Sequence, residues 1–368
     1  MDKQIYIDRI KKVKQAMDKE EIDVFFVSPS SDLFYLTGSE MEPDERLFLF
    51  IIPKKEDNFL IANILYKEQI KDLPLSDRIY WKDGDDPFAV LKNEIAKRGI
   101  NVKTIALDPK ITALFTLPLN ETFNETKFLL GSKLTNPLRM YKDENELELI
   151  REACEKSDKA LAALIDKGNY WLGKTEMDFL RELSLEMEKG GITSFGGSVQ
   201  AGQNAAIPHY ATGKAVIEKG KCLLVDFWGR YQGYFTDCTR TFYFGNSRRE
   251  FEKIYKIVLE AHLASEAKAM AGSSLEEVDH ASRDIIIKNG YGDFFTHRTG
   301  HGIGIDVHEG DSVNTGVKKI IKPGMVFSIE PGIYLLGKFG VRVENCVAIN
   351  ESGREILHKY PRELIIIN

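Results

Sequence analysis

Four carboxylates and one histidine occupy segments of this chain where a charged side chain has no packing role. Asp226 and Glu330 each end an apolar, strand-like run, Asp237 and Glu344 lie in two further strand-like runs, and His301 lies in a glycine-rich stretch. A strand carboxylate is most often a solvated edge charge, but one that follows an apolar run is expected to be buried and must then be paired or metal-bound. Such a set can hold two divalent cations that share bridging oxygens. The sequence therefore predicts a two-metal hydrolytic site.

The two aspartates flank one expected hairpin, with strands over residues 222–227 and 234–241. If Tyr231 and Gln232 are the central turn residues, Asp226 lies directly opposite Asp237. Opposite residues hold their Cβ atoms about 4.5–5.5 Å apart on one face of a sheet. Two carboxylates so close would repel each other in a dry site unless a cation lay between them.

The two glutamates flank a second expected hairpin, with strands over residues 325–330 and 341–347. A turn centred on Gly337 sets Glu330 opposite Glu344. Each hairpin would then present one carboxylate pair, although a one-residue slip in register would turn a ligand away.

His301 lies in the stretch 299–304, where three glycines suit close approach of the backbone to an ion or a substrate. His297 and His308 lie nearby, and His209 follows Pro208. A satisfied polar turn is the alternative for such a cluster. A nucleotide loop is disfavoured because the glycines read G-x-G-x-G and open no capped helix, and the H-E-x-x-H motif is absent after His308. The remaining histidines, assigned to the surface or to packing, are His262, His280 and His358.

The 368 residues predict two domains, 1–135 and 136–368. The first reads as a small α/β domain, with a helix near 7–17, strands near 22–27, 47–52 and 59–62, a turn-rich stretch at 120–136, and no motif that carries chemistry. The second alternates helices with antiparallel hairpins, which predicts an α+β domain with helices on one side of a curved sheet. Its helices are expected over 143–166, from Thr175 to Gly190, over 251–270, and from Ser274 to Gly290.

Composition excludes several classes of protein. A net charge of −6 gives no footprint for nucleic acid, and no apolar run approaches the ~18 residues of a membrane span. The N-terminus lacks the pattern of a signal peptide, which predicts a cytoplasmic protein. The four scattered cysteines form no Cys-x-x-Cys pair, so we expect buried free thiols and neither a thiolate zinc site nor a redox pair.

Several motifs together resemble the pita-bread metallopeptidases. They are Gly-Tyr-x-x-Asp-x-Thr-Arg-Thr around Asp237, Thr-Gly-His-Gly-Ile-Gly around His301 with His308-Glu309 after it, Ile-Glu-Pro-Gly-Ile-Tyr around Glu330, and Gly-Val-Arg-Val-Glu ending at Glu344. Residues 140–368 are similar to the branch of Xaa-Pro dipeptidases (prolidases) and Xaa-Pro aminopeptidases, and residues 1–135 resemble a creatinase-type N-terminal domain. The resemblance implies a pseudo-symmetric αβ sandwich with its site on the concave face of the sheet.

The resemblance also implies a metal-binding role for each of the five residues. Asp226 would chelate the first ion, His301 and Glu330 the second, and Asp237 and Glu344 would bridge both. The ions would be Mn²⁺ or Co²⁺, with Zn²⁺ and Fe²⁺ also compatible with one imidazole among carboxylates.

Further residues receive roles in substrate binding and catalysis from the same resemblance. Glu330 would relay the proton of the attacking water, and His308 would donate to the substrate carbonyl or oxyanion. His209 would line the leaving-group side, Arg342 would orient the substrate, and His297 would line the pocket.

The implied activity is hydrolysis of the Xaa-Pro bond of dipeptides by a hydroxide held between the two ions, in a cytoplasmic homodimer. The alternatives are an Xaa-Pro aminopeptidase that acts on longer peptides, a methionine aminopeptidase, and a non-catalytic or metal-free relative on the same fold. Retention of all five ligands argues against the last, and the N-terminal domain argues against methionine aminopeptidase. Trp228, Tyr210 and Asp311 depart from the family pattern and are expected to reshape the pocket.

Overall fold

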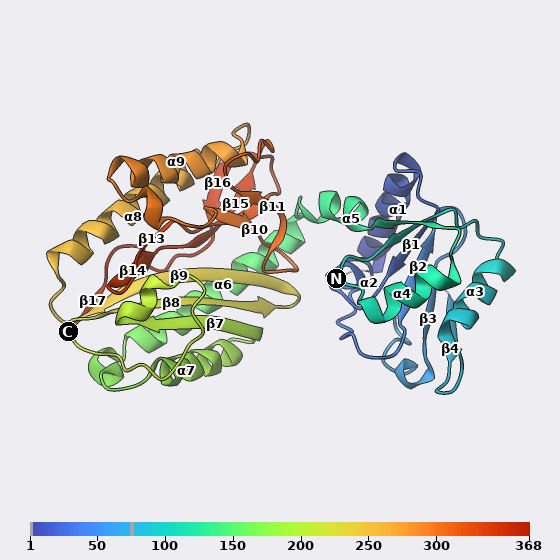
Figure 1. The fold of residues 1–368 in the computed structure, drawn as a ribbon, viewed down its shortest axis with the longest axis horizontal. Helices are drawn as coiled ribbons and strands as arrows, with labels where there is room; N and C mark the ends of the chain where they lie inside the picture. The colour runs from blue at the N-terminus through green and yellow to red at the C-terminus, as the bar shows by residue number, and fades with distance from the viewer. Residues whose placement is uncertain (1–2, 74–76) are drawn as a thin grey trace. The chain divides into compact units, whose positions relative to one another are not determined.

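The structure is a computed structural model that describes residues 3–73 and 77–368 (Figure 1). The chain forms two compact units, Met1–Arg139 and Met140–Asn368. The division follows helix α5 (Ser132–Arg139), whereas the boundary expected after residue 135 falls inside that helix. Pro137 lies within α5.

The first unit contains a six-stranded sheet in the order β4-β3-β2-β1-β5-β6. Strand β2 runs antiparallel to both of its neighbours, and the other pairs are parallel. Side chains of α3 and α4 join the strands in one apolar core. The elements are α1 (Lys3–Lys19), β1 (Val24–Val27), α2 (Ser31–Thr37), β2 (Leu49–Pro53), β3 (Phe59–Asn63), β4 (Asp77–Trp81), α3 (Pro87–Lys97), β5 (Thr104–Leu107), α4 (Ala113–Thr122), β6 (Lys127–Leu130) and α5.

Three of the four helices of the second unit begin where the sequence indicates, and the helix expected from residue 251 begins two residues earlier, at Arg249. Asp143, Thr175 and Ser274 each accept a hydrogen bond from the backbone three residues on, and the acidic residue there bonds back to the cap. Such capping boxes satisfy N–H groups that a helix start leaves free. The helices are α6 (Glu144–Ile165), α7 (Glu176–Lys189), α8 (Arg249–Lys268) and α9 (Leu275–Lys288). Among the residues described, no helix is both long and apolar enough to cross a membrane.

The strands of the second unit lie between its two pairs of helices (Figure 1). Helices α6 and α7 pack on β7–β9, α8 packs on β13 and β14, and α9 packs on β12 and β15. The single curved sheet expected from the sequence is divided into sheets of four and five strands and a two-stranded ribbon. The strands are β7 (Thr193–Ala201), β8 (Cys222–Tyr231), β9 (Tyr234–Phe244), β10 (Gly300–Gly302), β11 (Glu309–Val313), β12 (Val326–Ile329), β13 (Gly332–Leu335), β14 (Phe339–Arg342), β15 (Asn345–Asn350), β16 (Gly353–Ile356) and β17 (Ile366–Ile367).

Candidate metal centre and substrate cavity

The hairpin of β8 and β9 presents its two aspartates on one face, but not in the expected register. Its last pair is Tyr231 with Tyr234, so the central turn residues are Gln232 and Gly233, not Tyr231 and Gln232. Both have positive φ, 45° and 93°, as a tight two-residue hairpin turn requires, and a glycine adopts that conformation most easily. Asp226 therefore pairs with Thr239 and lies diagonally from Asp237. The shift moves the pairing by two residues, so both side chains keep the same face.

The second pair, Glu330 and Glu344, lies at a break between two antiparallel ladders. Strands β12 and β15 pair as far as Ile329 with Asn345, and pairing resumes in β13 and β14 at Gly332 with Arg342. Both ladders share the register centred on Gly337, which sets Glu330 opposite Glu344 as expected.

At the break the backbone bonds to other strands. The N–H of Glu330 donates to the carbonyl oxygen of Thr299 at 2.7 Å, and the N–H of Glu344 donates to that of Thr239 at 3.1 Å. These bonds tie the glutamates to the segments that carry His301 and Asp237.

His301 lies in β10, where the flanking glycines serve strand packing. A Cβ at Gly300 would meet the carbonyl oxygen of Ser328, and one at Gly302 would meet that of Glu309. The glycines therefore allow neighbouring backbone to approach, whereas the sequence had suggested approach of an ion or substrate.

The ring of His301 is oriented as a metal ligand requires. Its Nδ1 donates to the carbonyl oxygen of Gly302 at 3.1 Å. The lone pair of Nε2 then faces Asp237 Oδ2 at 3.6 Å and Glu330 Oε1 at 3.5 Å. Burial lowers the pKa of His301 to about 3, so the ring is in the neutral form that binds cations.

The five side chains converge into overlapping groups that fit divalent cations. In the group of Asp226, Asp237 and Glu344, and in the group of His301, Glu330 and Glu344, the candidate ligand atoms lie within 4.8 Å of one another. Asp237 Oδ1 and Glu344 Oε1 are buried and have no hydrogen-bond partner within the described ranges. An unsatisfied buried carboxylate oxygen is costly, and a cation between these groups would satisfy it.

The electrostatics of the cluster also call for cations. Burial raises the pKa of Asp237 and of Glu330 well above the ordinary range, and the carboxylate of Glu344 raises both further. Burial and then Asp226 raise the pKa of Glu344 to about 7. The guanidinium of Arg342 donates to Asp226 Oδ2 at 2.7 Å and lies 4.0 Å from Glu330 Oε2. The guanidinium of Arg298 also acts to lower the pKa of Glu330, but two guanidiniums cannot balance four carboxylates, and divalent cations would supply the missing positive charge.

A cavity of ≈ 510 Å³ opens above the cluster. The rings of His301 and His308 meet edge to face at 4.1 Å between centroids, and His209 lies exposed after the short helix η3 (Gly202–Ala206). His297 Nε2 lies 2.8 Å from the hydroxyl of Tyr334, and burial lowers the pKa of His297 to about 3. All nine residues singled out from the sequence line the cavity: Asp226, Asp237, His301, Glu330, Glu344, His209, His297, His308 and Arg342.

Arg298 also lines the cavity and was missed from the sequence. Its Nη1 donates to Ser312 Oγ at 2.9 Å, and within the described chain it makes no ion pair with a carboxylate. A half-buried guanidinium that forms no ion pair is available to an anionic group of a ligand. The only sequence signal was its place between His297 and His301.

Of the three residues that depart from the family pattern, two line the cavity and one does not. Trp228 lines the cavity, and its ring fills the space that a Cβ at Gly196 would need. Tyr210 also lines the cavity, and its hydroxyl donates to Glu176 Oε2 at 3.1 Å, which fixes the segment beside His209. Asp311 does not line the cavity, and its carboxylate lies 3.9 Å from Lys319 Nζ. The expectation that Asp311 reshapes the pocket was therefore wrong.

Comparison with known proteins identifies the family. The description "Metallopeptidase family M24" matches residues 148–351, and "Creatinase/Prolidase N-terminal domain" matches residues 9–141. The chain belongs to metallopeptidase family M24, with a pita-bread catalytic domain after a creatinase-type N-terminal domain. Membership implies divalent metal ions, which the cluster of carboxylates and His301 fits.

Individual relatives share both domains over nearly their full length. A putative dipeptidase of Bacillus subtilis is 32% identical over 98% of this chain and 100% of its own. A crystal structure of a recombinant prolidase from Thermococcus sibiricus has a TM-score of 0.93 at 34% identity, covering 100% of this chain and 99% of that one. An X-Pro aminopeptidase from Thermotoga maritima has a TM-score of 0.85 at 30% identity, covering 97% and 99%.

Proposed function

We propose that the protein is a dinuclear-metal Xaa-Pro dipeptidase. The observation that carries this proposal is one cavity that joins the cluster of five metal ligands to the guanidinium of Arg298. A dipeptide is the shortest peptide, so its free carboxylate lies one residue beyond the scissile bond. A guanidinium near the catalytic groups can bind that carboxylate, so it suits a dipeptide better than a longer chain. Similarity to a prolidase and to a putative dipeptidase supports the same substrate class.

Asp226, Asp237, His301, Glu330 and Glu344 would hold the two ions, with Asp237 and Glu344 shared. When bound, the ions activate a water and polarise the scissile carbonyl. Mn²⁺ or Co²⁺ suits this oxygen-rich ligand set best, and Zn²⁺ or Fe²⁺ remains compatible with it.

The residues around the ions would move protons and position the substrate. Glu330 accepts the proton of the attacking water and passes it to the departing nitrogen. His308, whose pKa is lowered by burial, donates a hydrogen bond to the developing oxyanion. The nitrogen of the scissile Xaa-Pro bond is part of the proline ring and carries no N–H, so His209 and Trp228 would recognise the leaving group by its shape. Arg342 and His297, linked through the hydroxyl of Tyr334, would line the same substrate cavity.

A paired assay tests the dipeptide preference. We expect faster turnover of an Xaa-Pro dipeptide than of the matching Xaa-Pro-Xaa tripeptide. In Arg298→Gln, loss of a charged hydrogen bond worth about 1.5–3 kcal/mol should raise KM for the dipeptide about 10–150-fold. Arg298→Lys, which keeps the charge, should lose less. The amide-capped dipeptide, which lacks the carboxylate, should respond to neither substitution.

The alternative is an Xaa-Pro aminopeptidase, which similarity to the Thermotoga maritima enzyme favours. A tripeptide that is much the better substrate, together with no effect of Arg298→Gln on the dipeptide, would establish that alternative and reject the dipeptidase. No hydrolysis of either peptide by protein loaded with Mn²⁺ or Co²⁺ would point to a non-catalytic binding module.

Two further properties belong to the same proposal. We propose a cytoplasmic location, which the four thiols, all buried and free of disulfide bonds, support. The homodimer implied by the family resemblance stays a prediction, and light scattering during size-exclusion chromatography would test it.

A further inference from the structure

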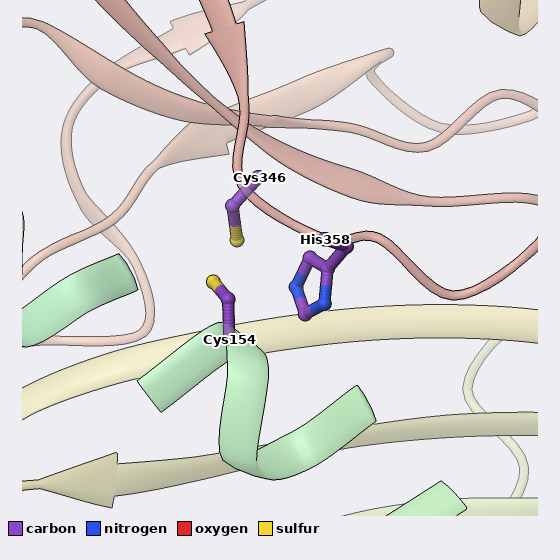
Figure 2. Close-up of side chains that lie close together, drawn as sticks. All are labelled: Cys154, Cys346 and His358. Atoms are coloured by element: carbon purple, nitrogen blue, oxygen red, sulfur yellow. The ribbon is translucent and has the colours of Figure 1, made fainter. Parts of the chain in front are cut away.

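Three of the four cysteines lie close together beside the backbone of Asp237 and Glu344, although they are far apart in the sequence. Cys154 lies on α6, Cys238 on β9 and Cys346 on β15, and His358 follows β16 beside them. All four side chains are buried. Figure 2 shows the sulfur atoms of Cys154 and Cys346 facing each other, with the ring of His358 at their side.

The geometry suits a single ion. One ligand atom each of Cys154, Cys346 and His358 lies within 4.8 Å of the other two. The hydroxyl of Thr236 lies 3.4 Å from Cys154 Sγ and 3.3 Å from His358 Nε2, so a fourth donor adjoins the group. Two sulfurs, an imidazole and an oxygen are enough for the tetrahedral shell of a zinc-like ion.

His358 is oriented by a carboxylate. Its Nδ1 lies 2.8 Å from Asp158 Oδ1, while Asp158 Oδ2 accepts from the backbone N–H of Tyr360 at 3.0 Å. A carboxylate on one ring nitrogen is the usual means of directing the other nitrogen to a metal. That other nitrogen now shares a hydrogen with the carbonyl oxygen of Asp237 at 2.9 Å, and an ion would take the place of this hydrogen.

We propose that Cys154, Cys346 and His358 form a second, structural metal site for one Zn²⁺-class cation, separate from the catalytic ions. Two thiolates and a neutral imidazole balance a divalent charge, so the complex can be buried without leaving an uncompensated ion. Sulfur ligands favour zinc, whereas the oxygen-rich catalytic set favours manganese. The scattered cysteines gave no such signal in the sequence because no two lie in one short motif.

Cobalt substitution distinguishes this site from the catalytic one, which contains no sulfur. The full-length protein is produced in cobalt-supplemented medium and then treated with a chelator. We expect about one retained cobalt per chain and a near-ultraviolet charge-transfer band from sulfur to cobalt. Both should be lost in Cys154→Ser and in Cys346→Ser. Both should persist in Cys222→Ser, because Cys222 is equally buried but lies outside the group.

Three results would overturn the proposal. The first is a folded wild-type protein without the sulfur band, and the second is a band that persists in Cys154→Ser. The third is a wild-type mass that is two hydrogens too low and is restored by a reductant, because that mass would mean a disulfide between the thiols. If the variants fail to fold, X-ray absorption spectroscopy of the zinc-loaded wild-type protein tests the proposal instead. Sulfur neighbours at about 2.3 Å support the site, and a shell of nitrogen and oxygen alone rejects it.

Discussion

At the scale of single residues, the proposed activity depends on the buried carboxylates, and Glu330 has two proposed roles. Glu330→Gln would remove the proposed proton acceptor and one proposed metal ligand together. General acid–base groups contribute about 10²–10⁴-fold, so kcat should fall at least 100-fold. The exposed Glu351 provides the matched control, because Glu351→Gln should leave kcat unchanged. A Glu330→Gln variant with nearly wild-type kcat would exclude the proposed proton relay.

We expect the same cluster to make the stability of the protein depend on pH and on bound metal. Burial raises the pKa of Glu344 to about 7, above its unfolded value, and shifts Asp237 and Glu330 the same way. In metal-free protein these groups favour folding below their unfolded pKa, and that contribution is lost as the pH rises through about 7.

Bound cations would offset the cost of burying these ionised carboxylates at high pH. We therefore expect the rise in Tm on adding Mn²⁺ to be larger at about pH 8 than at about pH 6, by several degrees. Thermal scans with chelator and with Mn²⁺ at both pH values measure it. An equal rise at both values would show that the carboxylates do not carry the effect.

The five clustered residues could be singled out from the sequence, Asp226 and Glu330 because each ends an apolar run and His301 because it lies among glycines. Arg298 could not be predicted, because the sequence around a single arginine does not show whether the fold brings an acidic residue into contact with it. The group of Cys154, Cys346 and His358 was also invisible, because only tertiary contacts bring these residues together.

At the scale of elements, the segment between β10 and β11 that carries His308 is held by a buried ion pair. Lys142 Nζ lies 2.8 Å from Glu309 Oε1, and Glu309 Oε2 accepts from the N–H of Ile305 at 3.0 Å. Breaking a buried pair from one side costs about 3–5 kcal/mol. We expect Lys142→Met to lower the free energy of unfolding by that amount and to reduce kcat by displacing His308.

An exposed pair of equal length gives the control. Lys338 Nζ lies 2.8 Å from Glu250 Oε1, with both side chains more than half exposed. Lys338→Met should cost less than about 1 kcal/mol in chemical denaturation. Equal losses in the two variants would contradict a special role for the buried pair.

Elements with strong local signals were predicted well, and those that depend on tertiary contacts were not. The caps of α7 and α9 and the strands β1–β3 were read from the sequence. The stretch 120–136, expected to be turn-rich, contains β6 and the start of α5, because pairing with β5 overrides a polar composition. The turn at Gln232 and Gly233 was misplaced by one residue, since its position follows from the positive φ of both residues.

At the scale of the whole molecule, each unit has its own apolar core, whereas all five proposed metal ligands belong to the second unit. We therefore expect two calorimetric transitions. Chelation should lower only the transition temperature of residues 140–368. Residues 1–139 expressed alone should reproduce the other transition. A single transition that moves as a whole would contradict this independence.

The central claim is that two cations are held by two carboxylate pairs and one histidine. Crystals grown with Mn²⁺ and measured at the manganese absorption edge test it most directly. The account predicts two anomalous peaks per chain, one ligated by Asp226, Asp237 and Glu344, the other by His301, Glu330 and the two shared carboxylates. A map without peaks at these side chains, or with a single peak that leaves Asp237 Oδ1 or Glu344 Oε1 unbound, would contradict it.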